Sequence, residues 1–159
     1  MQIRRAAICD LPGVSHLLEQ VLDIHHAGRP DLFRAHTRKY TDDELVQIFQ
    51  DDTRPVFVAV DEDAHPGEVL GYAFCIHQQH VDDNVLTDIR TLYIDDLCVD
   101  ESARGRHIGS ALYRYVLDYA RETGCYNVTL NVWACNESAR RFYEHMGLTQ
   151  QKIGMEAIL

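Results

Sequence analysis

An apolar segment, a short loop and an amphipathic helix follow one another late in the chain, and this order restricts the fold more than any other part of the sequence. Residues 92–99, Leu-Tyr-Ile-Asp-Asp-Leu-Cys-Val, are typical of a buried strand. A helix is predicted from about Arg106 to Glu122, with Gly124 ending it. Its apolar residues recur at helical spacing: Ile108, Ala111, Leu112, Tyr115, Val116 and Tyr119.

The loop between this strand and this helix is predicted to bind an anion. The first N–H groups of a helix have no partner inside the helix, and the helix dipole places positive charge at the same end. Arg104 and Arg106 add two guanidinium groups where a phosphate would lie.

A second segment, residues 136–148, predicts a short capped helix. Asn136 can cap its start, and Gly147 supplies the permissive backbone that ends it. Phe142 and Met146 continue an apolar stripe that begins at Ala139. Tyr143 lies about 60° around the helix from Met146, so its ring can pack while its hydroxyl reaches a cleft.

Together the two segments resemble the GNAT family of N-acetyltransferases, and the resemblance covers essentially the whole chain. Residues 104–109 resemble the family's coenzyme signature, in which Gln or Arg is followed by two residues, Gly, one residue, and Gly or Ala. Residues 136–148 resemble the family's late Asn, Phe-Tyr and Gly pattern. His107 departs from the signature, which has glycine there. Its side chain could crowd a pyrophosphate, project away from it, or add a donor.

This resemblance implies an acetyl-CoA-dependent N-acetyltransferase that transfers the acetyl group to a primary amine by direct attack. The acceptor would be a small cationic amine or a peptide or protein amine. The stretch around Asp95 is also similar to the polyamine acetyltransferases. The alternative is a non-catalytic acyl-CoA-binding or regulatory module of the same fold.

The resemblance also implies residue roles. Tyr143 would protonate the departing coenzyme A thiolate, and Asp95 would act as a base through water, with Asp96 as the weaker candidate. Three strand residues would pair with the pantetheine arm, residues of the following loop and helix start would hold the phosphates, and two residues of the late segment would complete the site. The coenzyme-binding candidates are Leu97, Cys98, Val99, Arg104, Gly105, Arg106, His107, Ile108, Gly109, Ser110, Asn136 and Ala139.

Other candidates for the acceptor site are Asp96, Asn131 and His25. Adjacent strand residues face opposite ways, so Asp95 and Asp96 share one sheet face only if a bulge intervenes. For Asn131 and Asn136 a capping or turn role is the alternative, and for His25 the alternative is a surface histidine. No metal site is expected, because His77 and His80 lack further ligands at metal spacing.

The element order predicts one domain over residues 1–159, of the α+β class, with three α/β/α layers. We expect a mixed, mostly antiparallel sheet of about seven strands and four helices. The other predicted strands cover residues 2–8, 55–60, 69–76 and 126–133, and residues 148–159 are expected to form the last two. The other helices are expected from Asp10 to about His25 and from Thr41 to about Gln50, and a turn is expected over residues 61–67.

Composition limits the partners and the compartment. The net charge of −10 argues against nucleic acid, whose binders carry a basic face. No apolar run approaches the roughly 20 residues that cross a bilayer, so no membrane is expected. The five cysteines contain no C-x-x-C pair, which favours a reducing compartment and hence the cytoplasm. Exposed final strands would make a homodimer possible.

Overall fold

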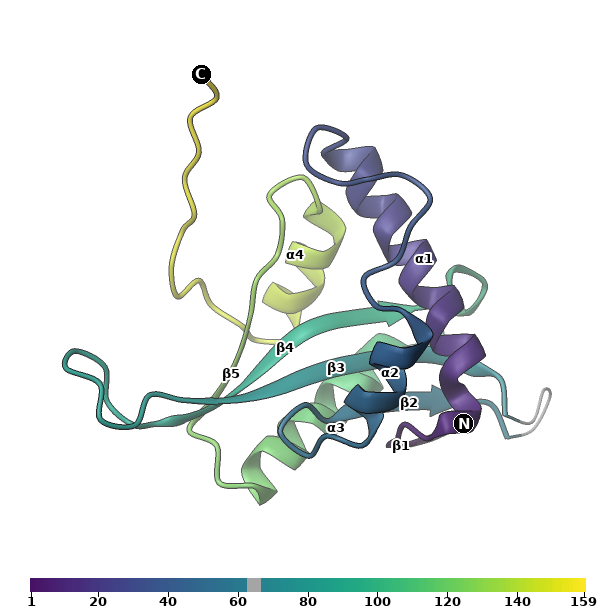
Figure 1. Cartoon of the computed structure of the whole chain (residues 1–159), viewed down its shortest axis with the longest axis horizontal. Coiled ribbons are helices and arrows are strands. Elements are labelled where there is room, and N and C mark those ends of the chain that lie inside the picture. Colours follow the sequence, from purple (N-terminus) through teal and green to yellow (C-terminus); the bar gives the residue numbers. More distant parts are fainter. Residues whose placement is uncertain (63–66) are drawn as a thin grey trace.

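The computed structural model describes residues 1–62 and 67–159. Five strands form one sheet in the order β1-β2-β3-β4-β5, and four α-helices accompany it (Figure 1). The strands are β1 (Gln2–Arg5), β2 (Val56–Val60), β3 (Val69–Gln79), β4 (Arg90–Val99) and β5 (Asn127–Leu130). The helices are α1 (Leu11–Gly28), α2 (Asp42–Phe49), α3 (Ile108–Glu122) and α4 (Glu137–His145), with short 3-10 turns at Ile8–Asp10 and Glu101–Ala103.

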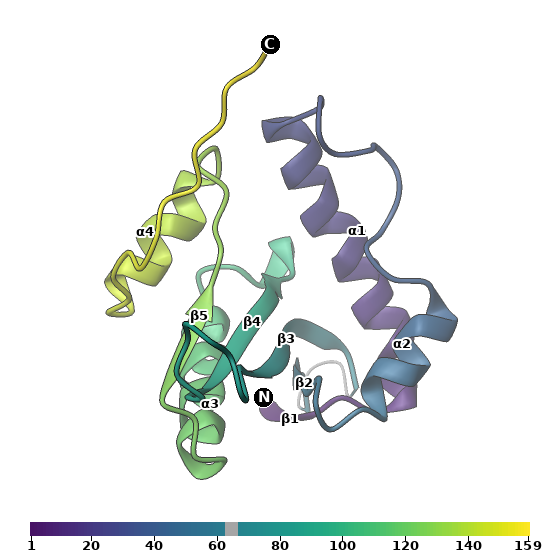
Figure 2. The same ribbon diagram turned by 60° about the vertical axis from the view of Figure 1, so that its left-hand side comes forward.

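The sheet is mixed and mostly antiparallel, as predicted. Strands β1 to β4 pair antiparallel with their neighbours, and only β4 and β5 run parallel. Helices α1 and α2 lie on one face, and α3 lies on the other (Figures 1 and 2). Alternation along the strands supplies both cores: Tyr72 and Phe74 pack with α1 and α2, whereas Ala73 and Cys75 pack with α3.

Local sequence explains where the helices begin and end. Thr41 and Glu44 form a reciprocal capping box at the start of α2. The side chain of Asn136 accepts a hydrogen bond from the N–H of Ala139 at the start of α4. Gly147 follows α4 with a φ of 93°, a left-handed conformation that favours glycine.

The prediction of about seven strands was wrong, because no strand is present in residues 148–159. This tail is extended and exposed, and it runs from the end of α4 toward the end of α1 (Figure 1). An ion pair joins the tail to the end of α1: the Arg29 guanidinium donates to both carboxylate oxygens of Glu156, each at 2.9 Å. A strand needs a neighbour for its main-chain hydrogen bonds, and the tail has none within the described chain. The turn predicted over residues 61–67 includes 63–66, which lie outside the described residues.

Candidate active site

A β-bulge in β4 places two acidic side chains on the same side of the sheet. Phe74 of β3 pairs with Asp96, but the next residue, Cys75, pairs with Ile94. Asp95 is therefore the extra residue of the bulge, and the usual alternation of side chains is interrupted there. Both carboxylates consequently meet groups on the α1 and α2 side, where Tyr72 and Phe74 also lie.

Asp95 accepts two hydrogen bonds from the segment that leads into α2. The Lys39 ammonium and the Tyr40 hydroxyl both donate to Oδ2 of Asp95, each at 2.8 Å. The Tyr40 ring stacks on Phe74 with centroids 5.6 Å apart, which fixes the hydroxyl over the bulge. Burial raises the pKa of Tyr40, and its hydrogen bond to Asp95 raises it further, so the phenol remains a donor.

Asp96 accepts a hydrogen bond from a side chain of the neighbouring strand β3. The Tyr72 hydroxyl donates to Oδ2 of Asp96 at 2.9 Å, and Tyr72 is itself fully buried. Burial raises the pKa of Asp96 to about 6, and the Asp95 charge adds to the effect, whereas the Tyr72 hydrogen bond and the Lys39 charge oppose it. A carboxyl group with such a pKa exchanges protons near neutral pH.

Beyond the bulge, β4 separates from β5. In the described part of the chain their ladder ends at Ile94 and Leu130, so Leu97, Cys98 and Val99 have no β5 partner. The Val99 carbonyl accepts from Nε of Arg104 at 3.4 Å. Without a neighbouring strand, the other N–H and C=O groups on that edge of β4 can pair with an extended ligand. Cys98 is buried, and burial raises the pKa of its thiol to about 12, so it is no nucleophile at neutral pH.

The loop after β4 is fixed at both ends and exposed between them. Ala103 and Ile108 are buried in one small core, whereas residues 104–107 are exposed. The first main-chain hydrogen bond at the start of α3 runs from Ala111 to the His107 carbonyl, at 3.0 Å. The N–H groups of residues 108–110 thus have no partner within the helix, and they fit an anion such as a pyrophosphate.

His107 adopts a left-handed backbone conformation, which favours glycine, the residue of the family signature at this position. Its φ is 61° and its ψ is 16°, in the left-handed region. Its side chain is exposed, so it projects from the loop and does not fill it. Of the sequence alternatives for His107, the structure shows projection into solvent.

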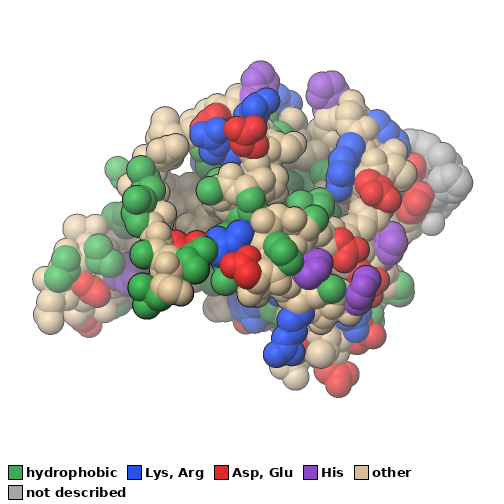
Figure 3. Space-filling view, turned by 90° about the horizontal axis from the view of Figure 1, so that it is seen from above, with side chains coloured by type: hydrophobic (Ala, Val, Ile, Leu, Met, Phe, Trp, Pro, Cys, Tyr) green, Lys and Arg blue, Asp and Glu red, His purple; other side chains and the backbone are tan. Residues whose placement is uncertain are grey.

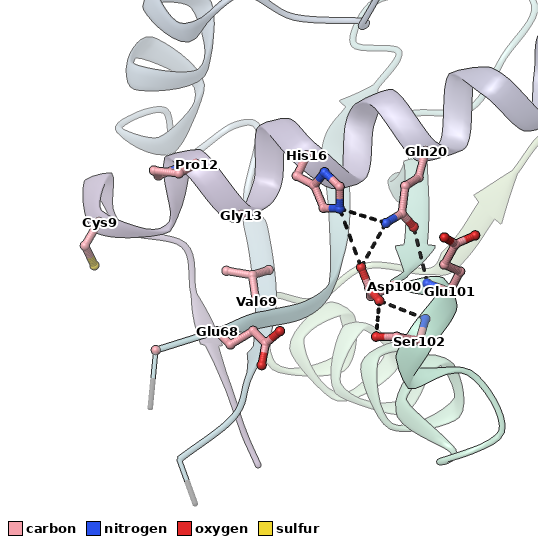
Figure 4. A pocket seen from close by; sticks show the side chains of 11 residues that line it. Cys9, Pro12, Gly13, His16, Gln20, Glu68, Val69, Asp100, Glu101 and Ser102 are labelled. Atoms are coloured by element: carbon pink, nitrogen blue, oxygen red, sulfur yellow. Dashed lines mark hydrogen bonds and ion pairs between the residues drawn. The ribbon is translucent and has the colours of Figure 1, made fainter. Parts of the chain in front are cut away.

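A side-chain network joins α1 to the turn that precedes this loop (Figure 4). Gln20 donates to Asp100 at 2.9 Å and accepts from the N–H of Glu101 at 3.3 Å. Asp100 also accepts from the N–H of Ser102 at 2.9 Å. The network borders an open pocket of about 540 Å³, which does not include Asp95, Asp96 or Tyr143. We interpret this side-chain network as the support of the loop that follows β4.

Tyr143 lies on α4, on the α3 side of the sheet. Its ring contacts Phe142 and Tyr113 edge-on, at 5.1 and 6.3 Å between centroids. Burial raises the pKa of Tyr143, and the charge of Asp96 adds to the effect, so the hydroxyl stays protonated. Among the described residues no group hydrogen-bonds this hydroxyl, which leaves it available to a ligand.

The remaining candidate residues are Asn131, His25 and Asn136. Asn131 donates to the Tyr93 hydroxyl at 3.2 Å, directly after β5. The His25 ring lies tilted against Phe33 with centroids 5.0 Å apart, and Phe33 meets Trp133 edge-on at 5.1 Å. This contact joins the end of α1 to the segment between β5 and α4. Asn136 uses its side-chain oxygen as the cap of α4, so the capping alternative holds for that residue.

Three partners of the acidic pair were missed from the sequence: Lys39, Tyr40 and Tyr72. Lys39 and Tyr40 lie in an irregular segment without periodicity, so no pattern singles them out. For Tyr72 the signal was present, because it alternates with Phe74 along a strand next to the acidic one.

Comparison with known proteins shows the family of this chain. The sequence profile of the Acetyltransferase (GNAT) family matches residues 18–148, which include the bulge, the loop and α4. The chain belongs to the GNAT family. A mutant form of the BH1408 protein from Bacillus halodurans has 30% identity and a TM-score of 0.93, over 100% of this chain and 99% of that one.

Other comparisons cover less of the chain or have a lower structural similarity. Glucosamine 6-phosphate N-acetyltransferase 1 of Oryza sativa subsp. japonica is 33% identical over 66 residues, 42% of this chain and 38% of its own length. The chain thus matches well under half of that relative. An aminoglycoside N-acetyltransferase in complex with coenzyme A shares the fold, with a TM-score of 0.71 and 16% identity over 99% of this chain and 98% of that one.

No described helix is long and apolar enough to cross a membrane. Seen from the end where the tail and the end of α1 lie, basic and acidic side chains are intermixed, without a continuous basic surface on that face (Figure 3). Among the described residues no group of three or more His, Cys, Asp or Glu side chains is placed to hold a metal ion.

Proposed function

We propose that this GNAT protein is an acetyl-CoA-dependent N-acetyltransferase that transfers an acetyl group to a primary amine by direct attack. The bulge in β4 carries the proposal, because it presents Asp95 and Asp96 together beside the open edge of β4. The anion-binding loop, residues 104–107, begins a few residues after the end of the same strand. A thioester held by that edge and that loop would end near the acidic pair.

The acceptor must lose a proton before it attacks. An alkyl amine with a pKa near 10.4 is about 4.6 kcal/mol from its neutral form at pH 7. A carboxylate that binds the ammonium also raises the amine pKa, so one group serves poorly for both binding and deprotonation. The two aspartates can divide these tasks: Asp95, the more accessible partner of a cation, would hold the amine, and Asp96, with a pKa of about 6, would receive the proton through water. This division differs from the family resemblance, which assigns the base role to Asp95.

The leaving sulfur needs a hydrogen-bond donor. Tyr143 supplies a protonated hydroxyl, and the raised pKa makes complete proton transfer to a thiolate, near pKa 8.5, uphill. The hydroxyl would therefore stabilise the departing sulfur as a donor and finish the transfer late.

The coenzyme would be held by the chain's free main-chain groups. Residues 97–99 would pair with the pantetheine arm, and the N–H groups of residues 108–110, with Arg104 and Arg106, would hold the pyrophosphate. Acetyl-CoA supplies the activated acetyl group.

The acceptor class is decided by a panel of amines. The acidic pair favours a cationic amine, whereas the names of the curated relatives point to an amino sugar phosphate. The panel contains a diamine, a polyamine, an amino sugar phosphate, an aminoglycoside and a peptide N-terminus. Because the chain has five cysteines, released coenzyme A is measured by chromatography and not by a thiol reagent.

We expect turnover with at least one amine, and a loss of about 100-fold or more in Asp96→Asn. The matched control is Asp118→Asn, an exposed carboxylate on α3. Binding of coenzyme A without turnover of any amine would contradict the proposal and favour the non-catalytic alternative.

Two further features belong to the proposal. All five cysteines are free, which suits a reducing compartment such as the cytoplasm. Strand β5 is an edge strand of the described sheet, and the apolar tail residues Ile153 and Met155 are exposed, which suits a homodimer. Sedimentation would test the dimer.

A further inference from the structure

Lysine is scarce in this chain, and one of its two lysines reaches the acidic pair. The only lysines are Lys39 and Lys152, and the other thirteen Lys or Arg residues are arginines. Lys152 lies in the exposed tail. Lys39 is preceded by Arg38 and followed by Tyr40, so the cation at the acidic pair is the one that carries a primary amine.

The position of the Lys39 ammonium is the position that an acceptor amine needs. Its Nζ lies 2.8 Å from Oδ2 of Asp95, and Asp96 is the next residue in the bulge. The ammonium also lies 5.5 Å from the centroid of the Tyr40 ring, whose hydroxyl donates to the same carboxylate oxygen. The side chain is 41% exposed, so it is not locked into the core.

We propose that Lys39 is a self-acetylation site, whose amine attacks an acyl-coenzyme A thioester bound in the same chain. The inference rests on the proposed function. It adds an acceptor built into the protein, and it indicates that the external acceptor carries an unhindered primary amine on a flexible alkyl stem.

The reaction balances without a further reagent. The Lys39 ammonium first gives one proton to the Asp96 carboxylate through water. The neutral nitrogen then forms a bond to the thioester carbonyl carbon, and the carbon–sulfur bond breaks. The nitrogen loses its second proton to water as the amide forms, while the sulfur gains a proton from Tyr143 and leaves as a thiol. Water then returns a proton to Tyr143, and one proton is released in net.

Acetylation would change the site, because an amide has no positive charge. Asp95 would lose its ion-pair partner while keeping the Tyr40 hydrogen bond. An external ammonium would then meet a carboxylate without a competing cation. The modified protein should therefore show a lower KM for a cationic acceptor than the unmodified protein.

The test incubates the full chain with acetyl-CoA and no added amine. Intact mass then counts the acetyl groups, and peptide mapping locates them. We expect one acetyl group at Lys39. The first-order rate constant for its formation should not depend on protein concentration. Lys152 serves as the internal control for chemical acetylation, and Lys152→Arg as the matched variant of Lys39→Arg.

Tyr143→Phe should slow labelling of Lys39 about ten-fold or more, and Lys39→Arg should abolish it. Equal labelling of Lys39 and Lys152, unaffected by Tyr143→Phe, would overturn the inference. An apparent first-order rate constant that rises in proportion to protein concentration would overturn it as well.

The amine panel separates the two proposals. Turnover of an external amine with Lys39 unmodified would overturn self-acetylation and leave the proposed function intact. Absence of both, with coenzyme bound, would contradict both proposals.

Discussion

Gly109 at the start of α3 lies against the ring of Phe142 from α4. A Cβ on Gly109 would meet Cζ of Phe142 and Cγ2 of Val99, each at 3.5 Å, which is ordinary contact. The two sequence motifs that indicated the family are thus packed on each other, and Val99 at the end of β4 lies against the first of them. This contact places the Tyr143 helix next to the anion loop.

A paired substitution tests how tightly β3 and β4 must approach near the coenzyme edge. A Cβ on Gly71 would lie 2.8 Å from the backbone oxygen of Cys98, which cannot move without shifting β4. We expect Gly71→Ala to lower the free energy of unfolding by about 1–3 kcal/mol. Gly109→Ala, where contacts are ordinary, is the matched variant and should lower it by less. Urea unfolding measures both, and equal losses would contradict this difference in packing.

His107 stores backbone strain that glycine would remove. Replacing His107 by glycine should raise the free energy of unfolding by about 0.5–1 kcal/mol, because glycine adopts a φ of 61° without a steric cost. His107→Val should lower it, since a branched side chain is disfavoured there. Thermal unfolding of the three proteins gives the order, and a valine variant as stable as the glycine variant would refute it.

Tyr143→Phe separates the role in chemistry from the role in packing. The ring contacts with Phe142 and Tyr113 are kept, but the donor to the leaving sulfur is lost. We expect kcat to fall about 10- to 100-fold with the affinity for coenzyme A unchanged. Steady-state rates and calorimetric binding measure the two quantities. Tyr126→Phe, on a 76% exposed tyrosine, controls for loss of a hydroxyl; unchanged kcat in Tyr143→Phe would remove the residue from the mechanism.

Asp96 should make the protein more stable in mild acid than at neutral pH. Its pKa is about 6 in the folded chain, whereas an aspartate in an unfolded chain has the ordinary value of 3.8. Between these values the folded state binds the extra proton, so stability falls as pH rises from about 4 to 6. This contribution is at most about 3 kcal/mol.

The comparison of Asp96→Asn with the protein of unchanged sequence isolates that contribution. The asparagine variant keeps an oxygen for the Tyr72 hydroxyl and has no charge to bury, so it should be the more stable protein at pH 7. The stability gap should shrink at pH 4.5. Urea unfolding at both pH values, with Asp118→Asn as the control, gives the result; a gap that is constant with pH would contradict the raised pKa.

Local signals in the sequence predicted the four helices closely. Capping residues such as Thr41 and Asn136, and glycines such as Gly147, act within one turn, so they are legible without knowledge of the fold. Strands were less predictable. Two strands were expected in residues 148–159, but a strand depends on a partner elsewhere in the chain, and Ile153 and Met155 stay exposed without one.

The candidate site was predictable only in part. The anion loop and Tyr143 follow from motifs, but the orientation of Asp95 and Asp96 depends on a one-residue mismatch between β3 and β4. Two acidic residues in an otherwise apolar strand are the only hint of it, because aspartate is depleted in strands. Lys39 reaches Asp95 across 56 positions of the sequence, a distance that no local pattern spans.

The separation of β4 from β5 beyond Ile94 leaves the sheet unfinished on one edge. The pantetheine arm of coenzyme A contains amide groups, so a coenzyme bound along residues 97–99 would complete the hydrogen bonding that the polypeptide leaves open. The bound coenzyme would then occupy the position of a neighbouring strand, and it could dissociate again. Occupancy and folding stability would rise together, and the apoprotein would be the less ordered form of the same architecture.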